Sequence, residues 1–256
     1  VAALVETWHE DASSPNLIAC APAGFRFIEK ARQHVDNLSL KTNHGGICLL
    51  YDKTLHARLI QLPTFSSFES LAIYIYRAGF NAVIIIVYRP GSSSVSQSFF
   101  DEFGDLLERL AIYSSPMMIV GDFNIHVDDC KDISSIKLLD ILASHTLHQH
   151  VHSPTHVHGH TLDLFITRDS QDIEMMPIDT PLLSDHSFVV AEVNCLPPAN
   201  ISADRRQVRN WRALDIDAFI ADLLCSDLVV SPPCDVTDAF VCYNETLKSL
   251  LNKHVP

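Results

Sequence analysis

The sequence predicts an α/β sandwich, a fold in which two β-sheets pack face to face and helices flank them. Apolar segments of strand length alternate with amphipathic segments of helix length, and several strands follow one another closely enough to form hairpins. Residues 82–88 are apolar throughout and mostly β-branched, which is typical of a central strand covered on both faces. The 256 residues suffice for one large domain with a small appendage.

The order of the elements follows from the same patterns. Strands are expected at residues 1–7, 45–51, 55–62, 71–77, 82–88, 116–120, 161–167 and 187–193. The tripeptide Arg-Pro-Gly at 89–91 should end the central strand. Apolar residues then recur at helical spacing over 95–110, with the serines at 92–94 available as caps, and residues 134–147 predict a second amphipathic helix.

The chain divides by composition into two expected parts. Residues 1–196 should form the first domain, and residues 197–256 a linker followed by a short helical segment. The stretch Pro-Pro-Ala-Asn at 197–200 is the expected linker, and a basic cluster surrounds Trp211 beyond it. The helices are expected at residues 215–225 and 235–253, and the basic residues are Arg205, Arg206, Arg209 and Arg212.

Charge and cysteine usage narrow the class of protein. The formal net charge of −13 argues against a strongly basic nucleic-acid-binding surface. The seven cysteines are widely spaced without a Cys-x-x-Cys pair, which predicts reduced thiols in an intracellular compartment. No apolar run reaches the roughly 18 residues of a membrane helix, so no membrane partner is expected. The chain begins at Val1 in what reads as the middle of a strand, which predicts a fragment.

Polar groups stand at the ends of apolar strands, where a rigid sheet can hold a site above its edge. Glu6 ends the first strand and can hold a hard cation such as Mg²⁺, although a solvated strand end is the alternative. Asp122 and Asn124 are two residues apart after the strand 116–120, so both should point to one side. The carboxylate can orient a water and the amide can hold a phosphate oxygen, whereas an Asx-type turn is the alternative.

Two further segments carry carboxylate and imidazole groups. Asp163 interrupts an apolar strand, and burying a carboxylate is costly unless the group has a partner. A histidine is the expected partner, and an edge-strand aspartate facing water is the alternative. Asp185 and His186 stand side by side just before the last strand. Histidine is the side chain most easily set for proton transfer near neutral pH, although an ordinary loop can carry the same residues.

The order of these groups along the chain resembles that of the endonuclease/exonuclease/phosphatase superfamily. It looks most like the apurinic-type endonuclease domain of non-LTR (LINE-like) retrotransposons. Three flanking segments carry this resemblance: GDFNIH at 121–126, SPTHVHGHTLDLFIT at 153–167 and VYRPG at 87–91. The resemblance covers residues 1–196 and implies a DNase I-like two-sheet sandwich. Residues 205–225 are similar to the connector that precedes reverse transcriptase in such elements.

The resemblance implies metal-dependent hydrolysis of a phosphodiester bond in DNA, with Mg²⁺ or Mn²⁺ as cofactor and DNA as partner. It assigns Glu6 to the metal, Asp122 to the attacking water and Asn124 to the scissile phosphate. In-line attack of water then relies on the metal and on positioned donors to offset the developing charge.

The resemblance assigns roles to a second group of residues as well. His186 would stabilise the pentacovalent phosphate, and Asp163 would hold the imidazole and raise its pKa. Asp185 would support the metal or the water, and Tyr88 would touch the phosphate. Arg89, next to this tyrosine, is a candidate for a phosphate contact.

Further expectations concern the whole element. The substrate implies a nuclear location, and a reverse transcriptase is expected C-terminal to this chain. The superfamily opens with a strand that carries an Asn before the Glu strand, and because the chain starts at the Glu strand, we expect that first strand to be missing here. A truncated, catalytically inactive transposon-derived protein is therefore one alternative function. A phosphatase acting on a phosphoinositide or another small phosphate ester is the other.

The histidines suggest a separate possibility. Seven of them crowd residues 145–160, and imidazole is a common zinc ligand. The resemblance instead assigns His156 and His160 to a loop beside the strand of Asp163. Zinc among these histidines stays an alternative to that assignment.

Overall fold

The computed structural model describes residues 1–32, 45–92, 94–168, 173–176, 184–193 and 214–255. The chain splits into two compact units, Val1–Asn200 and Ile201–Pro256. The expected linker at 197–200 and the basic cluster around Trp211 lie outside the described residues. Among the described helices, none is long and apolar enough to cross a membrane.

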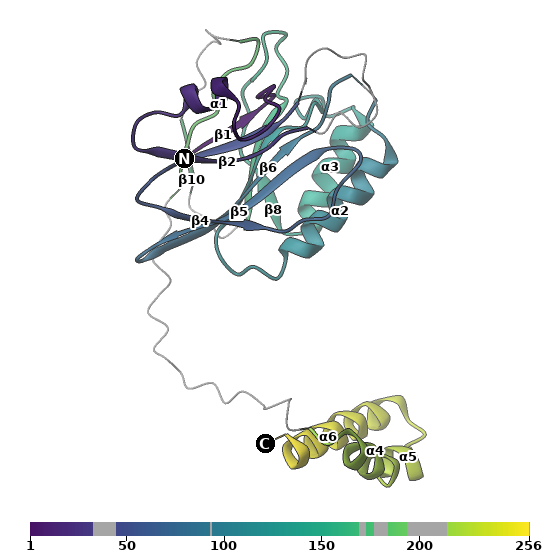
Figure 1. Cartoon of the computed structure of the whole chain (residues 1–256). Coiled ribbons are helices and arrows are strands. Elements are labelled where there is room, and N and C mark those ends of the chain that lie inside the picture. Colours follow the sequence, from purple (N-terminus) through teal and green to yellow (C-terminus); the bar gives the residue numbers. More distant parts are fainter. Residues whose placement is uncertain (33–44, 93, 169–172, 177–183, 194–213, 256) are drawn as a thin grey trace. The chain divides into compact units, whose positions relative to one another are not determined.

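A six-stranded sheet forms the centre of the first unit (Figure 1). Its strands, in spatial order, are β4 (His56–Ile60), β5 (Glu69–Arg77), β6 (Phe80–Tyr88), β7 (Met117–Asp122), β9 (Asp163–Arg168) and β8 (Leu147–Gln149). Strands β6 and β7 are parallel, and every other neighbouring pair is antiparallel. The parallel pair needs a crossover, which helix α2 (Gln97–Leu110) supplies.

Helices α2 and α3 (Ile133–Ser144) lie side by side against one face of this sheet (Figure 1). The side chain of Ser96 accepts a hydrogen bond from the Phe99 amide and caps α2. The cap therefore lies later than the serines expected at 92–94. Three phenylalanines of α2 pack into the core between the helices and the sheet: Phe99, Phe100 and Phe103.

A second, three-stranded sheet packs on the opposite face, which confirms the two-sheet fold. It has the order β1 (Ala2–Val5), β3 (Ile47–Asp52) and β2 (Phe25–Lys30), and α1 (Pro15–Cys20) precedes β2. Ile47 and Leu49 of β3 meet Ile73 and Ile84 of the large sheet in one apolar cluster. A separate pair, β10 (Ile173–Met175) and β11 (Ala191–Val193), completes the strands that the structure describes.

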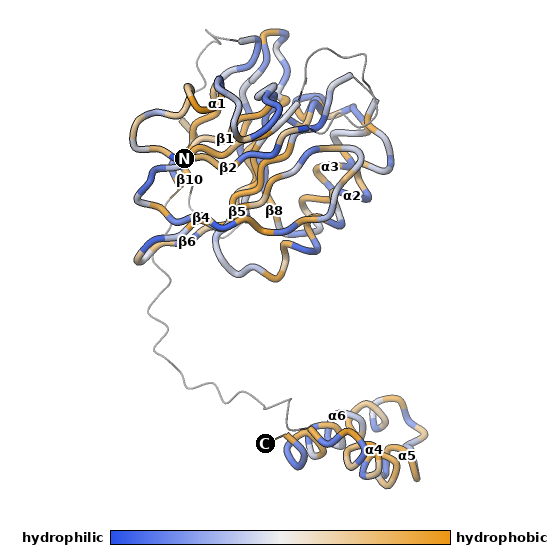
Figure 2. Tube along the Cα trace, viewed as in Figure 1, coloured by the Kyte–Doolittle hydropathy of each residue, from blue (hydrophilic) through white to orange (hydrophobic). Residues whose placement is uncertain are grey.

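Strand β6 is buried on both faces, as its apolar sequence predicts. Val83, Ile85 and Val87 face the helices, whereas Ile84 and Ile86 face the second sheet. Figure 2 shows this apolar character running through the central strands, with hydrophilic residues gathered in the connecting loops.

Some elements differ from the expectations. Strand β7 runs on through Asp122 instead of ending at residue 120, because Gly121 continues the pairing with β6 and β9. Helix α3 ends at Ser144, and residues up to 149 turn into the short strand β8. Helix α1 and strands β2, β8 and β10 were not expected. Strand β2 is half-exposed and polar, so its sequence lacks the apolar run that marks the buried strands.

The second unit consists of helices α4 (Ile216–Leu224), α5 (Asp227–Val230) and α6 (Val236–His254). Helices α4 and α6 lie close to the two expected positions, each capped by an aspartate, Asp215 and Asp235. Asp222 pairs with Lys253 and with His254, which ties α4 to the end of α6.

Candidate active site

The apolar interface between the two sheets ends in a row of polar side chains. Strand register pairs Glu69 with Tyr88, Tyr88 with Asp122, and Asp122 with Asp163 across β5, β6, β7 and β9. Paired residues of neighbouring strands lie on the same face, and this face is the one that packs on the second sheet. The sheet therefore brings together residues that are up to 94 positions apart, from Glu69 to Asp163.

Glu6 reaches this row from the second sheet. It follows β1 directly, and its φ of 50° turns the chain at the strand end. The Tyr88 hydroxyl donates a hydrogen bond to the Glu6 carboxylate. Burial, followed by this hydrogen bond, raises the pKa of Tyr88 above its ordinary value. Tyr88, expected to touch a phosphate, thus contacts Glu6 in the structure.

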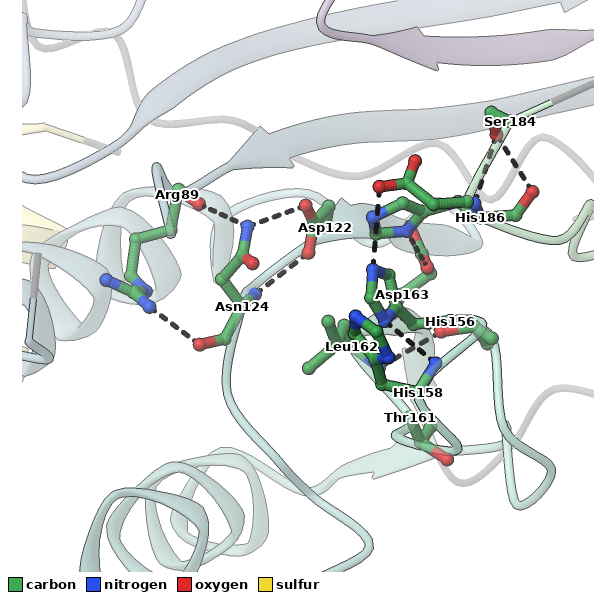
Figure 3. Close-up of polar contacts among 12 residues, drawn as sticks. Arg89, Asp122, Asn124, His156, His158, Thr161, Leu162, Asp163, Ser184 and His186 are labelled. Atoms are coloured by element: carbon green, nitrogen blue, oxygen red, sulfur yellow. Dashed lines mark hydrogen bonds and ion pairs between the residues drawn. The ribbon is translucent and has the colours of Figure 1, made fainter. Parts of the chain in front are cut away.

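Asp122 and Asn124 form a tightly hydrogen-bonded turn after β7 (Figure 3). The Asn124 amide N–H donates to Asp122 Oδ1 at 2.9 Å, and Asn124 Nδ2 donates to Asp122 Oδ2 at 2.6 Å and to the Arg89 carbonyl at 2.8 Å. Asn124 has a φ of 49°, a conformation that asparagine tolerates better than most residues. The Asx-type turn, which the sequence left as the alternative, is therefore present, and it holds the Asp122 carboxylate beside the Asn124 amide.

Gly121 makes the turn possible. Its φ is +136°, and a Cβ added here would lie 2.0 Å from the Val87 carbonyl oxygen of the neighbouring strand. Only glycine combines that backbone conformation with so close an approach. The glycine in the motif at 121–126 thus lets β7 carry Asp122 to the edge of the sheet.

Arg89 is buried beneath this turn, with 5% of its surface exposed. Its guanidinium donates to the carbonyls of Phe123 at 2.7 Å, Asn124 at 2.6 Å and Pro90 at 3.1 Å. Burial lowers the pKa of the guanidinium. The structure thus places Arg89 under the loop, where it supports backbone carbonyls, and not at a surface for phosphate as the sequence suggested. We call Arg89, Asp122 and Asn124 the site floor.

His186 pairs with Asp163, the partner expected from the sequence. Its Nδ1 lies 2.8 Å from Asp163 Oδ2. This hydrogen bond, helped by the Asp163 charge, raises the pKa of His186 to about 9 although burial opposes the shift. The hydroxyl of buried Thr155 accepts hydrogen bonds from the amides of Leu162 and Asp163, both at 3.0 Å, and so fixes the start of β9.

Asp185 lies outward from the row, with 68% of its side chain exposed. Its Oδ2 is 3.6 Å from Nε2 of His156. A backbone bridge joins His156 to His186, and the two rings are 4.8 Å apart between centroids. We call His156, Asp185 and His186 the site rim, and Figure 3 shows His156 and His186 close to Asp163.

The electrostatics of the floor suit a cation. Burial raises the pKa of Asp122 to about 7, and the charges of Asp163 and Glu6 push it the same way. Carboxylates gathered at this density repel one another, and a divalent cation would relieve that repulsion. Glu6 and the neighbouring aspartates are oxygen ligands of the kind that Mg²⁺ and Mn²⁺ prefer.

Glu69 and Arg32 belong to this region but carry no motif that singles them out. Glu69 accepts hydrogen bonds from the Gly46 amide at 2.8 Å and from Arg32 Nε at 2.5 Å. The Arg32 guanidinium carbon lies 5.4 Å from the centre of the Tyr88 ring. A charged residue at the start of the apolar strand at 71–77 was the available signal for Glu69.

Comparison with known families gives a match for the middle of the chain. Residues 82–190 match a family described as "Endonuclease-reverse transcriptase". This range contains Tyr88, Asp122, Asn124 and Asp163, together with the site rim. No curated protein matches the chain.

Three solved structures share the fold. The endonuclease domain of TRAS1, a telomere-specific non-LTR retrotransposon, has a TM-score of 0.52 and 16% identity, over 68% of this chain and 80% of that one. The human Nocturnin catalytic domain has a TM-score of 0.55 and 16% identity, over 75% and 80%. The 3′ phosphatase NExo from Neisseria has a TM-score of 0.50 and 15% identity, over 75% and 88%. At these identities the likeness concerns the fold.

The family match and the shared fold both agree with the motifs found in the sequence. The resemblance seen in the sequence is confirmed to this extent: residues 82–190 match the endonuclease-reverse transcriptase family, and the chain shares the DNase I-like two-sheet fold of these structures.

Proposed function

We propose that this chain is a divalent-metal-dependent endonuclease that hydrolyses a phosphodiester bond of DNA. One observation carries the proposal: strand register brings the buried carboxylate of Asp122 next to Asp163, which holds the His186 imidazole. Asp122, which can accept a proton, thereby lies beside the pair of Asp163 and His186, whose imidazole can donate one. The description of the matched family and the retrotransposon origin of TRAS1 support DNA as the substrate.

Asp122 is the group that accepts the proton of the attacking water. Its pKa of about 7 lies near the pH at which a general base works best. The side-chain and backbone N–H groups of Asn124 hold both carboxylate oxygens, so the base needs no reorganisation when the water arrives. The Asn124 side-chain oxygen lies on the same turn and is available to orient the water or a substrate hydroxyl.

His186 is the group that meets the developing negative charge. With a pKa of about 9 it carries a proton at neutral pH, and its hydrogen bond to Asp163 leaves Nε2 for a phosphate oxygen. An oriented, charged donor of this kind stabilises the transition state more than the ground state.

Glu6 is the first residue that would hold Mg²⁺ or Mn²⁺, with Asp185 in support from the rim. The bound cation would neutralise charge on the scissile phosphate and orient it. The Tyr88 hydroxyl donates a hydrogen bond to Glu6 and so fixes the direction of that carboxylate. Tyr88 is therefore a positioning residue, and Arg89 is another because it holds the carbonyls of the site floor.

The biological role follows from this chemistry. Nicking target DNA would supply a 3′ end for a reverse transcriptase encoded after this chain, as in a non-LTR retrotransposon. DNA as the proposed substrate supports a nuclear location for this activity.

Nicking of supercoiled plasmid tests the proposal. The wild-type chain should nick in Mg²⁺ and stop in EDTA, and Asp122→Ala or His186→Ala should lower the rate about 10²–10⁴-fold. Asp105→Ala, at an exposed position of α2, is the matched control and should nick like wild type. An oligonucleotide with a 3′-phosphate, assayed in parallel, detects phosphatase activity instead. A folded wild-type chain that leaves the plasmid intact in both Mg²⁺ and Mn²⁺ would contradict the proposal.

A further inference from the structure

We propose that the site rim binds a transition-metal ion of the Zn²⁺ class, at a position that shares Asp185 with the Mg²⁺ site but adds two imidazole ligands. His156, Asp185 and His186 each offer one ligand atom, and these atoms lie within 4.8 Å of one another. Among the described residues they are the one such group of histidine, cysteine or acidic side chains.

The backbone brings these residues together independently of their side chains. His156 and His186 form an antiparallel bridge between two loops. The Val157 amide donates to the Asp185 carbonyl at 2.9 Å, and the Ser187 amide donates to the Thr155 carbonyl at 2.7 Å. Backbone hydrogen bonds thus join the two loops on both sides of the cluster. The three ligand atoms therefore need to move little to coordinate an ion.

The ring of His186 is already oriented as a metal ligand requires. Its Nδ1 is engaged by Asp163 at 2.8 Å, which leaves Nε2 as the ligand atom. Histidines that bind metals almost always donate their other ring N–H to a carboxylate or carbonyl. Asp163 would therefore act as the outer partner that fixes the tautomer.

His156 presents Nε2 to the same space. That atom lies 3.6 Å from Asp185 Oδ2. Its other nitrogen, Nδ1, accepts a long hydrogen bond of 3.2 Å from the exposed His158 amide. Metal binding at Nε2 moves the proton of the neutral ring to Nδ1, so this contact is given up and water takes its place.

The ligand set fits zinc better than magnesium. Two imidazoles and one carboxylate, with a fourth position left for water, are typical of Zn²⁺, whereas Mg²⁺ prefers oxygen ligands throughout. Tetrahedral zinc, with bonds of about 2.0–2.2 Å, needs ligand atoms within roughly 3.5 Å of one another. The Asp185 side chain is 68% exposed, and its Oδ2 already lies 3.6 Å from His156 Nε2, close to this separation.

Occupation of the rim would have a consequence for catalysis, and this part rests on the proposed function. The ion would displace the Nε2 proton of His186 to solvent and bind that nitrogen, the atom that the proposed mechanism reserves for the phosphate. Zn²⁺ would then inhibit the nuclease even when Mg²⁺ is in excess.

Binding is tested with Co²⁺, whose visible absorption reports coordination, followed by displacement with Zn²⁺. The wild-type chain should bind one ion at the rim, and His156→Ala should weaken binding by at least about 10-fold, as should Asp163→Asn through the outer contact. His152→Ala removes an exposed histidine of the same loop and should bind like wild type. No saturable binding by wild type, or equal binding by His156→Ala, would overturn the proposal.

Inhibition is measured separately, as the Zn²⁺ concentration that halves plasmid nicking in Mg²⁺. Each variant is compared with its own rate without Zn²⁺, and His156→Ala should need at least about 10-fold more Zn²⁺ than His152→Ala. Zinc binding without any nicking would leave the rim site standing and reject the nuclease. Nicking that Zn²⁺ inhibits equally in both variants would reject the rim as the inhibitory site.

Discussion

The site floor and the site rim differ in how the fold holds them. Asp122 and Arg89 of the floor are 3% and 5% exposed, and their polar atoms bond to neighbouring backbone and side chains. In the rim, Asp185 is mostly exposed, and His186 relies on a single carboxylate. The difference teaches that the position of the Asp122 carboxylate is coupled to global stability, whereas the rim side chains depend on fewer contacts.

Gly121→Ala tests the floor with the largest expected effect. The new Cβ would meet the Val87 carbonyl at 2.0 Å, and the φ of +136° disfavours any side chain. The free energy of unfolding should fall by about 3 kcal/mol or more, measured by urea denaturation. Gly79→Ala is the control, since its φ is +76° but nothing lies within 4 Å of the added Cβ. Gly79→Ala should lower the free energy of unfolding by about 1–2 kcal/mol. Equal losses in the two variants would refute the role of the close approach between Gly121 and the Val87 carbonyl.

Arg89→Met tests the support beneath the floor. Removing the guanidinium leaves the buried carbonyls of Phe123 and Asn124 without donors, which should cost about 2 kcal/mol in urea denaturation. Arg58→Met, at an exposed position of β4, should change stability by no more than about 0.5 kcal/mol. If the two variants unfold at the same urea concentration, the floor does not depend on Arg89.

Asp163→Asn tests the link between floor and rim. The pKa of His186 should fall from about 9 toward its ordinary 6.5, as followed by NMR titration of the imidazole. Since the folded-state pKa is raised, the pairing stabilises the wild type fully below about pH 6.5 and the contribution disappears as pH rises through 9. The variant should be less stable by about 1–2 kcal/mol at pH 6, and the deficit should shrink toward pH 9.

Asp185→Asn is the matched control for that titration. Asp185 acts on His186 only through its charge, and as the weakest of the influences on that pKa. The substitution should therefore move the pKa of His186 much less than Asp163→Asn does. If Asp185→Asn moves the pKa of His186 more than Asp163→Asn does, the result would refute the contact between His186 and Asp163 as the main cause of the raised pKa.

Sequence patterns were sufficient to predict those features in which the burial of a residue follows from its chemical character. Strand β6 is apolar on both faces because it lies between helices and a second sheet, and the pairing of His186 with Asp163 follows from the cost of leaving a carboxylate alone. The fold class and a histidine partner for Asp163 could therefore be predicted from residues along the chain, whereas the identity of that histidine as His186 was implied by the resemblance.

The contacts of Arg89, Glu69 and His156 could not be predicted in this way. An arginine beside a motif of this kind suggests a ligand for phosphate, and only the path of the loop after β7 shows that carbonyls surround it. Glu69 joins the site through strand register with Tyr88, and His156 through a bridge to His186. Such relations depend on pairing between distant segments, which local periodicity does not encode.

The polar row from Glu69 to Asp163 also determines how the site can be lost. Because alternate residues of a strand face opposite ways, inserting or deleting one residue in β7 would turn Asp122 toward the helices while the apolar ladder could still form around it. A change of two residues would keep the facing but shift the carboxylate by a full pleat. A single-codon insertion or deletion in β7 would therefore take the Asp122 carboxylate out of the polar row.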